Sequence, residues 1–161
     1  MYKILMTVTI MLLGLIAGLF YSYSCSVNTG LGRLTDSDYL KAMQSINKII
    51  LNPWFFIIFI GTLFLLPLAT WLSYERAGTD QRFYLLLAAS IVYAIGVFGV
   101  TGMGNVPLNE ALARFNIETA SLQEIHVHRS AFEVPWNKLN LIRTCANLLS
   151  LLLALMAVIK S

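Results

Sequence analysis

Four residues with polar or aromatic side chains recur at helical spacing near the end of the chain: Trp136, Asn140, Arg143 and Asn147. Steps of four, three and four positions place them on one stripe of an α-helix. An arginine is costly in hydrocarbon, and ionisable side chains there usually face a protein interior or a wet cavity. Because a guanidinium stays charged and carries a planar fork of donors, Arg143 could hold an anion or an enolate oxygen. The alternative is an arginine that snorkels toward the interface and caps backbone carbonyls.

The element that must position this stripe is a membrane span. The chain has 161 residues, of which 58% are hydrophobic and only 12% are charged, whereas soluble domains are about a quarter charged. Four apolar runs are long enough to cross a bilayer, at 4–23, 54–72, 83–103 and 139–159. We predict an all-α integral membrane four-helix bundle that forms one domain over residues 1–161. The net charge of +3 is small and includes no basic run, which argues against a nucleic-acid partner.

The loops between these spans are unequal in length. Loops 24–51 and 104–138 are long, and four spans place both of them on one face, opposite the two termini. In the first long loop, Thr35 and Asp38 have the spacing of a helix cap. The apolar face of the helix that follows would hold Tyr39, Met43, Ile46 and Ile50.

The second long loop has no helix breaker over 107–129 and could hold another amphipathic helix. Pro135 should end or bend whatever precedes Trp136. Asn52-Pro53 before the second span is typical of a cap followed by proline at the first helical position. We therefore expect two amphipathic helical segments at the membrane surface that cap one face of the bundle.

Topology brings further polar and aromatic residues to this capped end. Besides the stripe, they are Tyr21 and Tyr23 after the first span, Asn105 and Asn109 after the third, and His126, His128 and Arg129 in the last loop. Such bundles keep their binding sites between helices. The two asparagines have two interpretations, as amides aimed into a cavity mouth or as a turn and helix cap beside Pro107.

The two histidines do not have the spacing of a metal site. His126 and His128 are two positions apart, and neither a His-x-x-x-His pair nor a Glu-x-x-His motif is present. We therefore predict no metal. A neutral imidazole can accept a proton near neutral pH, so either histidine is a candidate general base. The alternative is that both are surface residues.

Small residues recur in two of the spans. Gly14 and Gly18 form a GxxxG pair in the first span, and Gly96, Gly99 and Gly102 lie along the third. Small residues let membrane helices approach closely. We expect both sets to serve packing within the bundle.

Three short motifs together resemble the anthrone oxygenase-like family of small four-span membrane proteins. They are Asn105-Val106-Pro107-Leu108-Asn109, then Arg129, and then Trp136-Asn137 with Asn140-Leu141-Ile142-Arg143-Thr144. The resemblance implies oxidation of a polycyclic anthrone to a quinone by molecular oxygen, with no cofactor. It carries over Asn105, Asn109, Arg129, Trp136, Asn140 and Arg143. On this hypothesis Trp136, Tyr21 and Tyr23 line a slot, Arg143, Asn140 and Asn105 hold the oxyanion, and His126 or His128 is the base.

Two other classes of function fit the same residues. One is a non-catalytic membrane protein that binds a lipid, a quinone or another apolar molecule under the capping loops. The other is a structural subunit whose glycine faces dock a partner helix. We expect membrane lipid and an apolar small molecule as partners, with a homo-oligomer as a further possibility. We expect a bacterial cytoplasmic membrane. A raw count of basic residues places the long loops in the cytoplasm, whereas the basic residues close to span ends favour both termini there, and we predict the second orientation.

Overall fold

The computed structural model describes residues 2–160, which are almost entirely helical and include no β-strand. The helices are α1 (Tyr2–Ser22), α2 (Asn28–Leu31), α3 (Asp36–Ile49), α4 (Pro53–Ala77), α5 (Gln81–Val92), α6 (Val106–Arg114) and α7 (Leu122–Ile159). Three π-helical segments in this range continue α1 and α5, namely η1 (Tyr23–Val27), η2 (Tyr93–Gly99) and η3 (Thr101–Asn105). The predicted all-α fold is confirmed.

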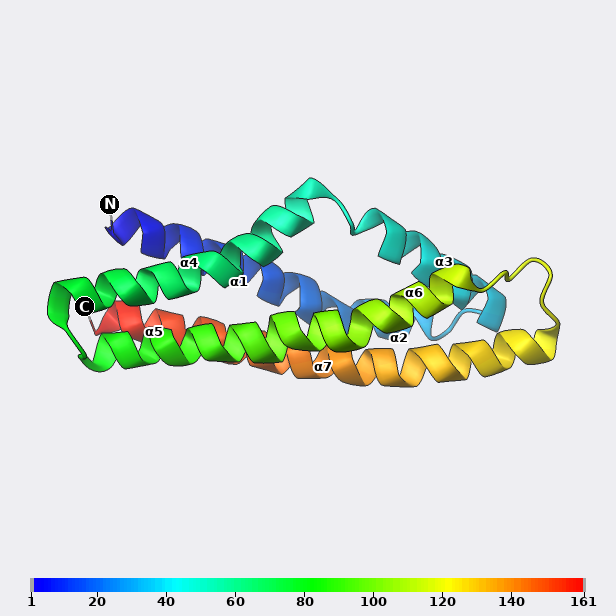
Figure 1. Cartoon of the computed structure of the whole chain (residues 1–161). Coiled ribbons are helices and arrows are strands. Elements are labelled where there is room, and N and C mark those ends of the chain that lie inside the picture. The colour runs from blue at the N-terminus through cyan, green and yellow to red at the C-terminus, as the bar shows by residue number, and fades with distance from the viewer. Residues whose placement is uncertain (1, 161) are drawn as a thin grey trace.

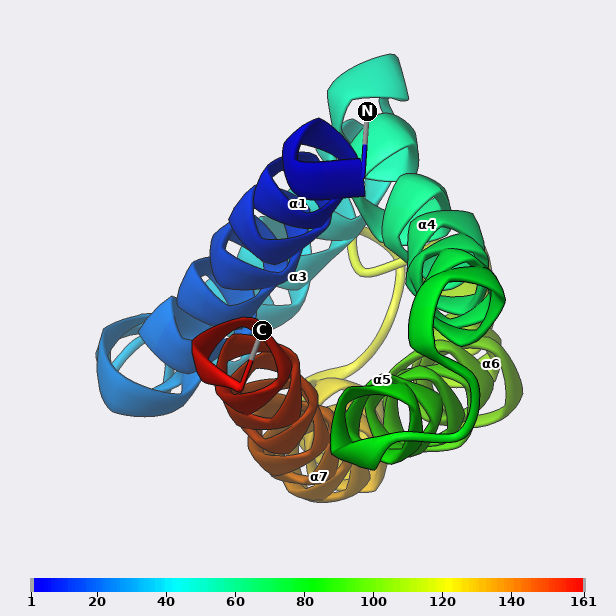
Figure 2. The same cartoon turned by 90° about the vertical axis from the view of Figure 1, so that its left-hand side faces the viewer.

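These elements join into four rods in the described part of the chain, covering 2–31, 53–77, 81–114 and 122–159. Each rod is long and apolar enough to cross a membrane, so the chain is an integral membrane protein. Figure 1 shows both termini and the α4–α5 connection at one end of the bundle, with α3 and α6 at the other. Viewed from the end that carries the termini, α1, α4, α5 and α7 surround the bundle axis (Figure 2).

Side-chain caps set where the helices begin. Asn52 Oδ1 accepts a hydrogen bond from the Phe55 amide at 3.1 Å, with Pro53 at the first position of α4. Thr35 Oγ1 accepts from the Asp38 amide at 3.3 Å and starts α3. Both starts agree with the sequence prediction. A third cap, a reciprocal pair between Ser121 and Glu124, starts α7, although the sequence analysis placed no helix start there.

The capping helix α3 packs on protein rather than on lipid. Its buried face, formed by Tyr39, Leu40 and Met43, meets Leu112 of α6 and Phe132 of α7. The amphipathic helix is thus confirmed, but the surface it covers is the end of the bundle. Burial of these large side chains is the main favourable term that holds α3 in place, because apolar surface leaves water.

The second long loop is far shorter than predicted. Residues from Val106 to Arg114 form α6 as a direct continuation of the third rod, and α7 already begins at Leu122. Pro135 lies inside α7 and does not end it, so of the two expected effects, an end or a bend, the end is wrong. A proline removes one backbone hydrogen bond. Burial of Phe132 and Trp136 on either side keeps the helix continuous here.

Among the described residues, glycines allow the closest approach between helices in the third rod. A Cβ built on Gly96 would lie 2.6 Å from the Cβ of Ala146 in α7, and one on Gly104 would lie 2.9 Å from Leu139. A Cβ on Gly14 or Gly18 would meet nothing within 4 Å. The expected packing role therefore holds for Gly96. It is wrong for Gly102 and for the GxxxG pair of α1, where an added Cβ would meet nothing within 4 Å, and Gly99 meets only atoms close to it in the chain.

We predict that Gly96→Ala destabilises the bundle, because its methyl group must displace α7 from α5 and η2. Overpacking of this kind costs about 1–3 kcal/mol. The measurement is reversible unfolding of the purified protein in mixed micelles. Gly14→Ala is the matched control and should unfold no earlier than the native chain. Equal stability of the two variants would contradict the close contact.

Candidate functional site

A chamber lies under α3, where the four rods meet the cap. Its volume is about 130 Å³. Six aromatic side chains line it, namely Phe20, Tyr23, Phe55, Phe56, Phe59 and Trp136. Its polar lining includes Asn47, Asn105, Asn109 and Arg143. The sequence-predicted residues Tyr23, Asn105, Asn109, Trp136 and Arg143 therefore come together around one space.

Arg143 is buried in the wall of this chamber, with 7% of its surface exposed. Its Nε and one Nη donate to Asn140 Oδ1 at 3.1 and 3.0 Å. The guanidinium carbon lies 4.2 Å from the centre of the Phe20 ring and 5.2 Å from that of Trp136. No carboxylate in residues 2–160 forms an ion pair with it. The faces of these two aromatic rings and the amide oxygen of Asn140 thus compensate the positive charge of Arg143 only in part.

Asn140 fixes the direction of this guanidinium. Its Nδ2 donates to Ser24 Oγ at 2.9 Å and to the Phe20 carbonyl at 3.3 Å, so its Oδ1 must face Arg143. The Ser24 hydroxyl also lies 3.2 Å from that of Thr144. Asn140 therefore lies behind Arg143 and orients it, and it does not line the chamber itself.

Two π-helical segments border the chamber. Tyr23 comes from η1, whereas Thr101 and Asn105 come from η3. A π-helical turn widens a helix locally, and such turns are frequent at functional sites. The sequence analysis did not identify these segments. It also missed Asn47, a polar residue among the apolar positions of α3, and that interruption was the available signal.

Asn105 has a buried amide that is left without a partner. The residue is 1% exposed, and neither its Oδ1 nor its Nδ2 has a hydrogen bond within the described structure. A buried amide without a partner costs free energy, and native proteins seldom keep one. In contrast, Asn109 Oδ1 accepts from the Trp136 indole at 2.9 Å and is satisfied. Asn105 therefore offers both a donor and an acceptor to whatever enters the chamber.

A second cavity of about 410 Å³ adjoins the chamber between α3 and α6. Asn47, Leu51, Val106 and Asn109 line both spaces. Glu110 lines this outer cavity, which we call the vestibule. The shared residues place the vestibule at the mouth of the chamber.

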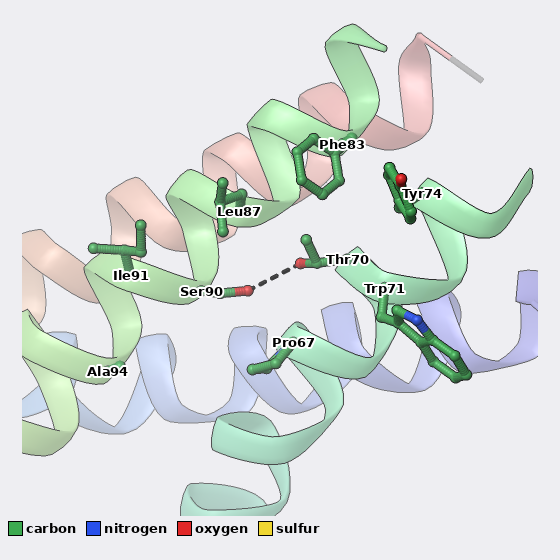
Figure 3. A pocket seen from close by; sticks show the side chains of 9 residues that line it. All are labelled: Pro67, Thr70, Trp71, Tyr74, Phe83, Leu87, Ser90, Ile91 and Ala94. Carbon is green, nitrogen blue, oxygen red and sulfur yellow. Dashed lines mark hydrogen bonds between the residues drawn. The ribbon is translucent and has the colours of Figure 1, made fainter. Parts of the chain in front are cut away.

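A larger cavity of about 540 Å³ opens between α4 and α5 (Figure 3). Its walls include Trp71, Tyr74 and Phe83, and no charged residue lines it. The hydroxyls of Thr70 and Ser90 lie 3.1 Å apart, and each also lies within hydrogen-bond distance of a backbone carbonyl of its own helix. This cavity has the size but not the groups for proton transfer or anion binding, so we place the candidate site at the smaller chamber.

Besides Asn140, four sequence-predicted site residues lie outside both the chamber and the vestibule. Tyr21 is 55% exposed on the outer face of α1. His126 Nδ1 lies 2.8 Å from the Asp36 carboxylate, and the exposed ring of His128 stacks on Phe115 at 3.7 Å. Arg129 is the fourth, and it binds the loop before α3. The structure does not bring these residues to Arg143.

Arg129 ties the α2–α3 loop to α7. Its Nη atoms donate to the carbonyls of Leu34 and Gly32 at 2.8 and 2.9 Å, and to Asp36 Oδ1 at 2.8 Å. Its Nε donates to Glu133 Oε2 at 2.8 Å. The hydrogen bond from His126 and the charge of Arg129 lower the pKa of Asp36. We call these contacts the Arg129 clamp.

Within residues 2–160, no group of three histidine, cysteine, aspartate or glutamate side chains could hold a metal ion. The charged group available to a ligand in the chamber is Arg143, and Asn105 supplies the open amide. This arrangement can bind a flat apolar molecule that carries an oxygen with negative charge.

Comparison with known proteins gives a family match over most of the chain. The family model described as anthrone oxygenase matches residues 54–153, which include Asn105, Trp136 and Arg143. The search of curated proteins and the search of solved structures each returned no match.

The Arg129 clamp generates a prediction about pH. Because the folded state lowers the pKa of Asp36, this carboxylate stabilises the fold above the ordinary carboxyl range and stops doing so as the pH falls. Asp36→Asn should therefore lower the thermal unfolding temperature at neutral pH, and its difference from the native chain should shrink below about pH 4. Glu75→Gln is the control, because it changes an exposed carboxylate near the C-terminal end of α4, at the end of the bundle opposite the clamp. A pH-independent difference for Asp36→Asn would contradict the clamp.

Proposed function

The chain belongs to the anthrone oxygenase family, and from that premise we propose that it is a membrane oxygenase of a flat, apolar, aromatic substrate. The chamber binds the substrate, and Arg143 holds the oxygen on which negative charge develops. This activity follows from the family together with the chemistry of the lining. It uses molecular oxygen and no cofactor.

The observation that carries this proposal is a buried guanidinium with no acidic partner. Burying a cation without an anion is expensive, so proteins usually pair it. Arg143 lines a space walled by aromatic rings, and its charge is left for something in that space. An enolate or phenolate oxygen would pair with the Arg143 guanidinium, and the ring system that carries it would pack against the aromatic walls.

The chemistry proceeds through an anion of the substrate. An anthrone carries a CH2 group between two rings and a carbonyl opposite, and loss of one proton gives an anion spread over the rings and the oxygen. The anion donates an electron pair to O2, which forms a C–O bond and becomes a peroxide. The peroxide then takes up a proton, and loss of the second C–H proton with cleavage of the O–O bond releases water and leaves a C=O group. Arg143 stabilises the first anion, as donors aimed at developing charge do.

The proton leaves through the vestibule in this proposal. Neither an imidazole nor a carboxylate lines the chamber among the described residues, whereas Glu110 lines the adjoining vestibule. Its contact with Arg114 at 3.5 Å is long and exposed, so the carboxylate is available to accept a proton. We assign Glu110 as the proton acceptor.

The two adjoining spaces also set the size of the substrate. A dry cavity of about 150 Å³ accommodates a single benzene ring, and the chamber measures about 130 Å³. A molecule of three fused rings therefore places one ring beside Arg143 and extends through the shared mouth into the vestibule. Substrates with three fused rings should all contact Asn47 and Asn109 where the chamber meets the vestibule, and they should therefore compete with each other for binding.

The chamber also supports a second candidate function, in which the protein binds an apolar molecule without converting it. The lack of an imidazole or carboxylate in the lining of the described chamber favours this alternative. An aromatic or quinone compound that copurifies with the protein, together with no oxygen uptake, would decide for binding alone.

We further propose that both termini face the cytoplasm of a bacterial cell. Lys3, Arg76, Arg82 and Lys160 lie close to span ends on that side of the bundle, and near-membrane basic residues favour the cytoplasm. A cysteine placed at Gly78, in the α4–α5 connection, should react with an impermeant reagent only when the cytoplasmic side is open.

We predict that Arg143→Ala lowers kcat for oxidation of a hydroxylated anthrone by about a hundredfold, the usual cost of losing one donor to an oxyanion. Oxygen uptake by purified protein is the measurement. Arg33→Ala removes an exposed arginine that forms no ion pair among the described residues and should leave the rate unchanged. Full activity in a folded Arg143→Ala variant would remove the role assigned to this residue.

Asn105→Leu separates function from folding at the same site. Leucine has the same branched shape, its larger volume can extend into the chamber, and it removes an amide that is buried without a partner, so the variant should unfold no earlier than the native chain. It should nevertheless turn over more slowly, because the substrate loses a hydrogen-bonding group. Normal turnover would assign Asn105 to packing alone.

Glu110→Gln tests the proposed proton acceptor. We expect a loss of about 10²-fold in kcat, at the lower end of what a positioned base contributes, with partial recovery at high pH as hydroxide replaces the carboxylate. His128→Gln alters an imidazole outside both spaces and tests the competing assignment. A loss in His128→Gln and none in Glu110→Gln would transfer the role to histidine.

A further inference from the structure

A groove of about 340 Å³ lies at the opposite end of the bundle from the chamber, and we call it the terminal groove. Its lining comes from the first turns of α1, the start of α5 and the end of α7, which are the ends that face the viewer in Figure 2. Lys3 and Arg82 line it, each from a different helix. Met6 and Ile10 form part of an apolar wall beside them.

Two polar atoms of the groove residues are left without partners. The Nε of Arg82 and the hydroxyl of Tyr2 are buried, and neither has a hydrogen bond within the described structure. The Arg76 guanidinium lies 5.1 Å from the centre of the Tyr2 ring, which adds a third cation nearby. Buried polar groups normally find partners, so these atoms are available to a bound group that accepts hydrogen bonds.

No carboxylate lines the terminal groove in the described part of the chain. Asp80 is close in sequence to Arg82, but its side chain accepts the Phe83 amide at 2.8 Å and caps α5. Neither Lys3 nor Arg82 forms an ion pair among the described residues. The groove therefore carries uncompensated positive charge next to an apolar wall.

We propose that the terminal groove binds an anionic phospholipid. Its phosphodiester lies between Lys3 and Arg82, where a guanidinium fork and an ammonium both suit phosphate oxygens. One acyl chain lies along Met6 and Ile10, at the depth where the first turns of α1 enter hydrocarbon. Because an apolar wall lies beside the two cations, we assign the site to a lipid and not to free phosphate, which has no apolar part to pack there. This proposal does not depend on the proposed oxygenase function.

The test compares lipids on the full chain held in phosphatidylcholine nanodiscs. Retention of dioleoylphosphatidylglycerol is measured by native mass spectrometry, with additional dioleoylphosphatidylcholine and inorganic phosphate as competitors. Removing one near-membrane cation should lower anionic-lipid retention about fivefold. We expect this loss in Lys3→Gln and in Arg82→Gln, and a larger one in the double variant. We expect neither competitor to displace the anionic lipid.

Matched controls remove the same charges elsewhere. Lys138→Gln and Arg33→Gln change exposed cations at the capped end and should retain the lipid as the native chain does. Ile10→Trp fills the apolar wall without a change in charge and should also lower retention. Equal losses in all of the charge variants would overturn the proposal, because attraction would then be general. Displacement by inorganic phosphate, or normal retention in Ile10→Trp, would overturn the assignment to a lipid.

Discussion

The structure depends on a cation that is buried where a membrane protein can least easily keep one. Arg143 has no acidic partner in the described chain, and its charge is met by the faces of Phe20 and Trp136 and by the amide of Asn140. Each of these partners is fixed in turn, since Asn140 binds Ser24 and Trp136 binds Asn109. The arginine thus draws α1, α6 and α7 together around one space.

Two of the three π-helical segments in the described chain lie at the level of that space. Segments η1 and η3 supply Tyr23, Thr101 and Asn105 to the chamber, while the rods that contain them continue on either side. A continuous rod keeps its backbone hydrogen bonds inside the membrane, as hydrocarbon demands. A π-helical turn shifts side-chain directions without breaking the rod. The chain can therefore build a polar lining here and still satisfy its backbone.

The sequence was sufficient for the parts of the fold and site that depend on local pattern. Apolar runs, the Asn52-Pro53 cap and the spacing of Asn140 and Arg143 each specify structure within a few residues. The role of Arg129 depends on Asp36, which lies 93 positions away in the chain. Spacing alone therefore could not show that Arg129 forms the clamp instead of lining the chamber. The same limit applies to Gly14 and Gly96, because only the neighbouring helix decides which glycine needs its missing side chain.

The contacts between α3 and the end of the bundle have a consequence for biosynthesis. Gln44 donates to carbonyls 68 and 71 positions further along the chain, and α7 must also be synthesised before the Arg129 clamp can form. The partners of α3 therefore follow it in the chain, and the last of them lie in the first part of α7. The cap over Arg143 can therefore form all of its contacts only after the first three rods have been synthesised.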